Sequence, residues 1–292
     1  MIQISSNFDI INRLKELFDN LRYLDTLSDG DYCDFKNISF VTPISIIPIA
    51  AIINKKHLKV RTSGDGSEYL NVICFPPGIP EVKEPFRKKT YLPIIHLVID
   101  TLDSQWLANQ LDKLHEHFLQ LLRTNIIADQ IFLQFVTEDT MGFLVGESLD
   151  NIKEHSNAQN IYIFAQYWPA INSCEICIVD DGKGFLGSLK SAGRDVLDSM
   201  DALKKVIEKG LSAKTGDPDS IRGTGIKNIR DAITNHEING EFILISGDAG
   251  FVHTAKHEKK LMQIKDYFWQ GTVVSMKLNK PPNVFNLYHY VK

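Results

Sequence analysis

The sequence lacks an excess of basic side chains and an uninterrupted apolar run. Its 292 residues include 32 lysines and arginines against 36 aspartates and glutamates, a net charge of −4. The basic footprint of a nucleic-acid-binding protein is therefore missing. The most apolar window, residues 38–53, contains serines, a threonine and two prolines, and it is too short to span a bilayer. Residues 1–5 carry no basic segment followed by an apolar one, as a secretory signal would, so we expect a cytoplasmic protein without a membrane or nucleic-acid partner.

The four cysteines offer no zinc site. Cys174 and Cys177 match C-x-x-C, but residues 174–179 have the composition of a strand. Residues three apart in a strand point to opposite faces of the sheet, so these two thiols cannot bind one zinc ion. Since no second cysteine or histidine pair has a matching spacing, we expect both side chains to be packed in the core.

A phosphate-binding loop of the type G-x-x-x-x-G-K-[ST] is also missing, because Cys177 stands where its first glycine should precede Lys183. The segment Gly182–Gly187 does match the G-x-G-x-x-G pattern of dinucleotide-binding folds. However, Asp180 and Asp181 would meet the pyrophosphate there, and the preceding strand is expected to pair in a hairpin rather than through a βαβ crossover. A Rossmann-type dinucleotide-binding protein is therefore a remote alternative.

The first hundred residues predict a small α/β domain. Apolar spacing and turn signals indicate a helix, a strand, a helix begun by Thr42-Pro43 and two short strands, at residues 8–24, 33–41, 43–53, 57–62 and 69–75. The segment Asp34–Pro43, in which an acidic residue and an apolar strand precede a proline at a helix start, resembles STAS domains. This resemblance implies a regulatory or interaction domain over residues 1–100.

The remaining residues, 101–292, predict a second domain with both helices and strands. A strand is expected before it at residues 91–99, where Pro93 favours either an edge strand or a position at the strand start. Helical patterns lie at residues 103–125, 129–155, 195–209 and 226–235. Strand patterns lie at residues 161–165, 174–179, 241–246, 250–254 and 272–278, and the first two should form an antiparallel hairpin.

Three polar residues, Glu147, Asn151 and His155, stand four residues apart in the second of these helices. Steps of four keep side chains near one helical face, so a carboxylate, an amide and an imidazole form a row. Such a row suits acid–base chemistry, a metal ligand and a phosphate contact. It equally suits a solvated face with a histidine near the helix end.

A second glycine pair, Gly223-Thr224-Gly225, separates a long polar loop from a helix start. Free backbone N–H groups at a helix start, together with the helix dipole, can bind an anion such as a triphosphate. Taken alone, the same pattern is typical of a flexible loop that ends at a helix.

Together these segments resemble the GHKL superfamily, which includes gyrase, MutL, histidine kinases and the large heat-shock ATPase chaperone. Its ATP-binding (Bergerat) fold carries E-x-x-x-N-x-x-x-[HK], D-x-G-x-G, a lid and G-x-G-[LI] in this order. The matching segments are Glu147–His155, Asp180–Gly184 and Gly223–Ile226, and Gly271-Thr272 resembles the late Gly-Thr of the family. The resemblance covers residues 101–292 and implies an α+β fold: a Bergerat-type α/β sandwich with a mixed, mostly antiparallel sheet and helices on one face.

The resemblance also implies ATP and Mg²⁺ as cofactors. Asn151 would bind Mg²⁺ through its amide oxygen, and Glu147 would be the general base. Asp180 would accept a hydrogen bond from the adenine amine, with Thr272 bonded beside it. The other implied ATP contacts are His155, Gly182, Gly184, Lys214, Gly223, Thr224 and Gly225.

Three functions fit these residues. An ATPase that drives a conformational switch would use Glu147 to orient water, as gyrase-like members do. A protein kinase would use it on a substrate hydroxyl, and the STAS-like domain with E-x-x-x-N-x-x-x-H-S resembles anti-sigma serine kinases. A sensor histidine kinase acting in cis is disfavoured, because the usual pattern around its histidine is missing at His115-Glu-His117. The third function is an ATP-gated protein-interaction module without turnover. The superfamily further implies a protein partner and a lid-closed homodimer.

Overall fold

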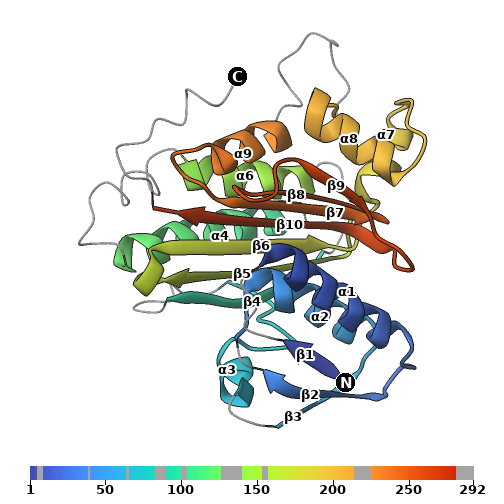
Figure 1. Cartoon of the computed structure of the whole chain (residues 1–292). Coiled ribbons are helices and arrows are strands. Elements are labelled where there is room, and N and C mark those ends of the chain that lie inside the picture. Colours follow the sequence, from blue (N-terminus) through green and yellow to red (C-terminus); the bar gives the residue numbers. More distant parts are fainter. Residues whose placement is uncertain are drawn as a thin grey trace.

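The computed structural model contains two β-sheets and the helices that cover them (Figure 1). It describes residues 1–4, 9–38, 40–63, 66–82, 90–99, 104–125, 140–152, 157–213 and 225–280. The smaller sheet belongs to an N-terminal unit, and the larger sheet is built from the rest of the chain.

The N-terminal unit is a three-stranded parallel sheet with the strand order β1-β2-β3. In chain order its elements are β1 (Ile2–Ile4), α1 (Ile10–Asp25), β2 (Tyr32–Ile38), α2 (Pro43–Lys55), β3 (Lys59–Thr62) and α3 (Gly66–Val72). The helix predicted after Thr42 is confirmed. Pro43 occupies its first position, where no N–H is needed, and Ser45 Oγ accepts a hydrogen bond from the backbone N–H of Thr42 (2.9 Å). Pro48 lies inside this helix, which nevertheless continues to Lys55.

The strand predicted at residues 69–75 is wrong. Residues 66–72 form helix α3, and the buried side chains of Leu70 and Ile73 are three residues apart, as on one face of a helix. A short apolar run does not by itself distinguish the helical period from the strand period, which explains the error.

The larger sheet has seven strands in the order β4-β5-β6-β10-β7-β8-β9, and each neighbouring pair is antiparallel. These strands are β4 (Tyr91–Val98), β5 (Asn160–Trp168), β6 (Ser173–Asp180), β7 (Glu241–Gly247), β8 (Ala249–His253), β9 (Lys260–Gln263) and β10 (Trp269–Asn279). The chain is therefore an α+β protein, as predicted, and the hairpin of β5 and β6 is confirmed. β4 is the edge strand that Pro93 favoured. The domain boundary expected at residue 100 falls after this first strand of the larger sheet.

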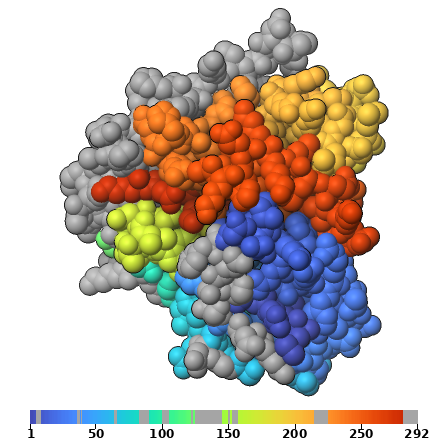
Figure 2. Space-filling model, viewed as in Figure 1, coloured from blue at the N-terminus to red at the C-terminus, as the bar shows by residue number. Residues whose placement is uncertain are grey.

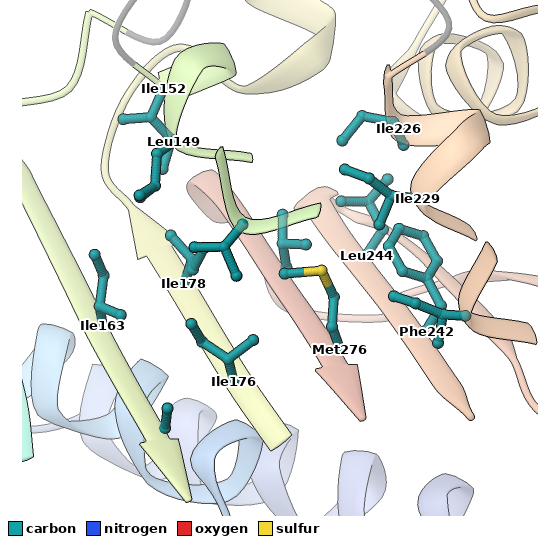
Figure 3. Packing of buried hydrophobic residues seen from close by; sticks show 14 of the residues in the cluster. Leu149, Ile152, Ile163, Ile176, Ile178, Ile226, Ile229, Phe242, Leu244 and Met276 are labelled. Carbon is teal, nitrogen blue, oxygen red and sulfur yellow. The ribbon is translucent and has the colours of Figure 1, made fainter. Parts of the chain in front are cut away.

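Helices cover one face of the larger sheet (Figure 1). They are α4 (Ser104–Asn125), α6 (Thr140–Asn151), α7 (Gly184–Ser191), α8 (Ser199–Lys209) and α9 (Gly225–Thr234). Of the helix predicted at residues 129–155, the structure describes residues 140–152. Figure 3 shows how side chains from the α6 and α9 segments meet those of four neighbouring strands: Leu149, Ile152, Ile226, Ile229, Ile163, Ile176, Ile178, Met276, Leu244 and Phe242.

The opposite face of the larger sheet is covered by the N-terminal unit. Helices α1 and α2 share one hydrophobic core with side chains of β5, β6, β7 and β10, and Figure 2 shows the N-terminal residues (blue) packed against the later chain. Because both faces are covered, every residue of β6 is buried. Cys174 belongs to the core on the helical side and Cys177 to the core on the N-terminal side, which confirms that the two thiols point to opposite faces.

A buried ionic cluster joins the two units. Arg13 on α1 lies 2.6 Å from Glu241 on β7 and 3.6 Å from Glu175 on β6. The Glu175 carboxylate also accepts a hydrogen bond from the backbone N–H of Ile44 (2.9 Å), in the first turn of α2. A negative group of the larger sheet therefore meets the positive end of this helix. Burial raises the pKa of Glu175, while Arg13 and the Ile44 N–H oppose this rise.

Candidate functional site

A cavity lies on the helical side of the larger sheet, beside the end of β6. Its walls come from α6, α7, α8, the loop after α8, the start of α9 and the strands β6 and β10. Residues singled out in four separate sequence motifs line it together: Glu147, Asn151, Asp180, Gly184, Gly225 and Thr272. The apolar part of the wall includes Phe185, Leu189, Val206, Ile226 and Val274.

Asp180 is the buried carboxylate of this cavity. The residue is 1% exposed at the end of β6. The backbone N–H of Gly182 donates a hydrogen bond to one carboxylate oxygen (2.8 Å), and the hydroxyl of Thr272 donates to the other. Burial raises the pKa of Asp180 to about 6, and these two hydrogen bonds limit the rise. At neutral pH the site therefore presents a carboxylate that can accept a further hydrogen bond from a ligand amine.

The start of β10 fixes the segment Asp180–Gly182. The indole N–H of Trp269 donates to the carbonyl of Asp180 (3.3 Å), and the amide of Gln270 donates to the carbonyl of Gly182 (2.7 Å). Gly271 has φ +104°, and a Cβ at this position would collide with the Asp180 carbonyl oxygen. The register of β10 against β7 shifts between Trp269 and Thr272, which makes this segment a bulge. The Gly-Thr pair singled out in the sequence lies in this bulge, directly beside Asp180.

Asp181, although adjacent in the sequence, has a structural environment. One of its carboxylate oxygens accepts hydrogen bonds from the backbone N–H groups of Gln159 and Asn160 (both 2.8 Å), and the other accepts from the Asn160 side-chain amide (2.7 Å). These bonds fix the start of β5. Of the two neighbouring carboxylates, Asp180 is the one that lines the cavity.

The glycines after Asp180 have different roles. Gly182 supplies the N–H that bonds Asp180, and it does not line the cavity. Gly184 does line it, has φ +64° and begins helix α7, which no sequence pattern indicated. A Cβ on Gly184 would lie 2.5 Å from the hydroxyl oxygen of Ser246, a residue of β7. Ser246 carries no motif, and its position beside the site follows only from the pairing of β7 with β10.

Glu147 and Asn151 share one face of α6, as their four-residue spacing predicts, and both line the cavity. The start of α9 meets this face, since a Cβ on Gly225 would collide with Glu147 Oε2 and lie 3.9 Å from Asn151 Nδ2. The side-chain nitrogen of Asn151 is buried and has no hydrogen-bond partner among the described residues. A buried polar group of this kind suits contact with a ligand.

The Asn151 amide is a cavity side chain that could bind a metal ion. The described part of the chain contains no group of three or more histidine, cysteine, aspartate or glutamate side chains that could hold a metal. The oxygen of this amide is the kind of ligand that Mg²⁺ binds, and Mg²⁺ commonly takes further oxygens from phosphates and water. The other expected ATP contacts, His155, Lys214, Gly223 and Thr224, lie outside the described residues.

Comparison with known proteins gives no assignment. No protein-family model matches the chain, and no curated protein matches it in sequence. Within the described ranges, no helix is both long enough and apolar enough to cross a membrane. The antiparallel pairing of β5 with β6 removes the crossover that a Rossmann-type site requires.

Proposed function

We propose that the protein binds ATP with Mg²⁺ in the cavity beside β6, as a GHKL-type protein with a Bergerat-type ATP-binding domain and a STAS-like N-terminal domain. The observation that carries the proposal is the convergence of four distant motifs on one cavity. These motifs contribute Glu147 with Asn151, Asp180, Gly225 and Thr272. Each motif alone has a structural explanation, whereas packing alone gives no reason for all four to line the same cavity.

The cavity offers a suitable group for each part of ATP. The Asp180 carboxylate accepts a hydrogen bond from the adenine amine, and Phe185, Leu189 and Ile226 provide apolar surface for the ring. The start of α9 at Gly225 presents the positive end of a helix to the phosphates. Asn151 would hold Mg²⁺ through its amide oxygen, and the bound ion would neutralise part of the phosphate charge.

We further propose that Glu147 is the general base. Its carboxylate lies against the start of α9, where the phosphates would bind, so it is placed to take a proton from a nearby hydroxyl. An ATPase would take this proton from water, and a kinase would take it from a hydroxyl of a protein partner. An ATP-gated interaction module without turnover is the alternative. The four unpaired cysteines suit a reducing compartment such as the cytoplasm.

The proposal is tested by isothermal titration of the protein with ATP in the presence of Mg²⁺. We expect saturable binding at one site, and the absence of any binding would refute the proposal. Glu147→Gln should keep the affinity but lower the rate of phosphate transfer or release by about 10²- to 10⁴-fold. Glu68→Gln, on the exposed side of α3, is the matched control and should leave both unchanged.

Labelled ATP separates the two reactions. Free labelled phosphate indicates an ATPase, and label on a co-purified protein indicates a kinase. If Glu147→Gln turned over ATP at the wild-type rate, Glu147 would not be the base. If wild-type protein bound ATP without turnover under all conditions, the interaction module would be the correct alternative.

A further inference from the structure

The hydroxyl of Ser246 connects two segments of the candidate site. Ser246 is 3% exposed on β7 and pairs with Thr272 across the β7–β10 ladder. Its oxygen accepts a hydrogen bond from the backbone N–H of Phe185 (3.0 Å), and its proton is donated to the carbonyl of Gly271 (3.0 Å). One side chain therefore forms hydrogen bonds both with the start of α7, which follows Asp180 in the chain, and with the start of β10, which lies beside Asp180.

The bond from Phe185 compensates for a missing helix cap. The first N–H groups of a helix have no partners within the helix. Lys183, at the N-cap position of α7, makes no side-chain capping bond, and Phe185 is the second residue of this helix. Ser246 supplies the acceptor from a distant strand, and the lack of a side chain on Gly184 leaves room for it. The start of α7 is therefore attached to β7.

The bond to Gly271 fixes the bulge that surrounds Asp180. Three consecutive residues of this bulge contact the segment Asp180–Gly182. The contacts are made by the Gln270 side-chain amide, the Gly271 backbone and the Thr272 hydroxyl. A bulge interrupts the regular ladder and needs other contacts to hold one conformation. Ser246 provides such a contact at the central residue of the three.

We infer that Ser246 is a positioning residue for the nucleotide base: through Gly271 it sets the direction of the Asp180 carboxylate, and through Phe185 it places the apolar wall of the cavity. Ser246 itself does not line the cavity, so it acts through these two neighbours. This inference rests on the proposed ATP site. It assigns a role to a residue that no sequence motif marks.

The test compares Ser246→Ala with Ser246→Thr and with Ser173→Ala. Ser173 is a matched control, since it is equally buried in the same sheet and its hydroxyl donates to a strand carbonyl, that of Leu278 (3.1 Å), at the far end of β6. We expect Ser246→Ala to weaken binding about tenfold, because it removes two hydrogen bonds. The factor should be the same for ATP and for adenosine, because the affected contacts lie at the base. Ser246→Thr, which keeps the hydroxyl, should recover most of the affinity, and Ser173→Ala should leave it unchanged.

Hydrogen exchange of the ligand-free protein supplies an independent measurement. Ser246→Ala should speed exchange in residues 182–191, and Ser173→Ala should not. Unchanged exchange in this segment, or unchanged adenosine affinity, would overturn the inference. The two proposals can also fail separately. If Ser246→Ala speeds exchange but the wild-type protein binds no ATP, the proposed function is refuted, whereas the attachment of α7 by Ser246 is supported. If Ser246→Ala does not fold, Ser246→Cys can replace it in both measurements, because the thiol has a similar shape but is a weaker hydrogen-bond donor.

Discussion

Strand β6 carries two buried carboxylates on opposite faces of the larger sheet, and their surroundings differ. Asp180 faces a cavity and accepts hydrogen bonds from a hydroxyl and a backbone N–H. Glu175 faces the packed N-terminal unit and lies beside Arg13. Burial raises the pKa of both groups. Burial alone therefore does not identify a functional carboxylate. A neighbouring cation marks the structural one, and an adjoining cavity marks the candidate ligand-binding one.

Among variants that test this difference between Glu175 and Asp180, Arg13→Met should have the largest effect on stability. It removes the cation between Glu175 and Glu241 and leaves a buried carboxylate uncompensated, so we expect a loss of about 3–5 kcal/mol in the free energy of unfolding. Denaturant titration at pH 7 measures this loss. Without Arg13 the pKa of Glu175 should rise further, so the loss should become smaller as the pH is lowered and this carboxylate is protonated. The double variant Arg13→Met/Glu175→Gln should recover stability, and a failure to recover would contradict this explanation.

The next effect should come from Asp180→Asn, which separates ligand binding from stability. Asparagine keeps one oxygen for the Gly182 N–H but presents an amide where the adenine amine needs an acceptor. We expect ATP affinity to fall by about 2–3 kcal/mol, or roughly 30- to 150-fold. At pH 7 the same variant should be more stable than the wild type by about 1–3 kcal/mol, since it removes a buried charge. Calorimetric titration and thermal unfolding measure the two changes, and a loss of stability at pH 7 would argue against the ionised state of Asp180.

This gain in stability should depend on pH in a defined direction. The pKa of Asp180 rises from 3.8 to about 6 on folding, so its ionisation opposes folding above that range. The advantage of Asp180→Asn should be complete above about pH 6 and vanish below about pH 4, where the carboxyl is protonated in both states. ATP affinity of the wild type should fall as the pH drops through 6.

The smallest effect should come from Lys277→Met. Lys277 also pairs with Glu241, at 3.4 Å, but both side chains are about one-fifth exposed. A partly solvated pair of this kind contributes less than about 1 kcal/mol. Comparison of the Lys277 and Arg13 variants at the same pH therefore separates the effect of burial from that of charge. Equal losses for the two would show that burial of the ion pair does not decide its contribution.

Much of the site was predictable from the sequence because its residues obey local spacing. Glu147 and Asn151 share a face through the helical period, and Asp180 ends a strand whose alternation points it to the helical side. The partners of these residues were not predictable. Ser246 and Trp269 reach the site only through the pairing of distant strands, and Glu175, between two apolar residues, has no local signal for its contact with Arg13.

Errors in the predicted elements have the same origin. Residues 66–72 are too few to distinguish the helical period from the strand period. Helix α7 begins at Gly184, and the acceptor for the N–H of its second residue, Phe185, is Ser246 on a distant strand. The three residues of β1 and the four of β9 are short enough to escape pattern analysis, and each is defined by its neighbouring strand.

The bulge at residues 269–272 has a consequence for changes in chain length. Side chains alternate between the two faces of a strand. Deletion of one residue in this bulge would therefore turn Thr272 away from Asp180, or else turn the side chains on the other side of the deletion to the opposite face of the sheet. Surface loops usually absorb insertions and deletions easily. In this protein, a segment inside the sheet should be the least tolerant of them, and related sequences should align through residues 269–272 without gaps.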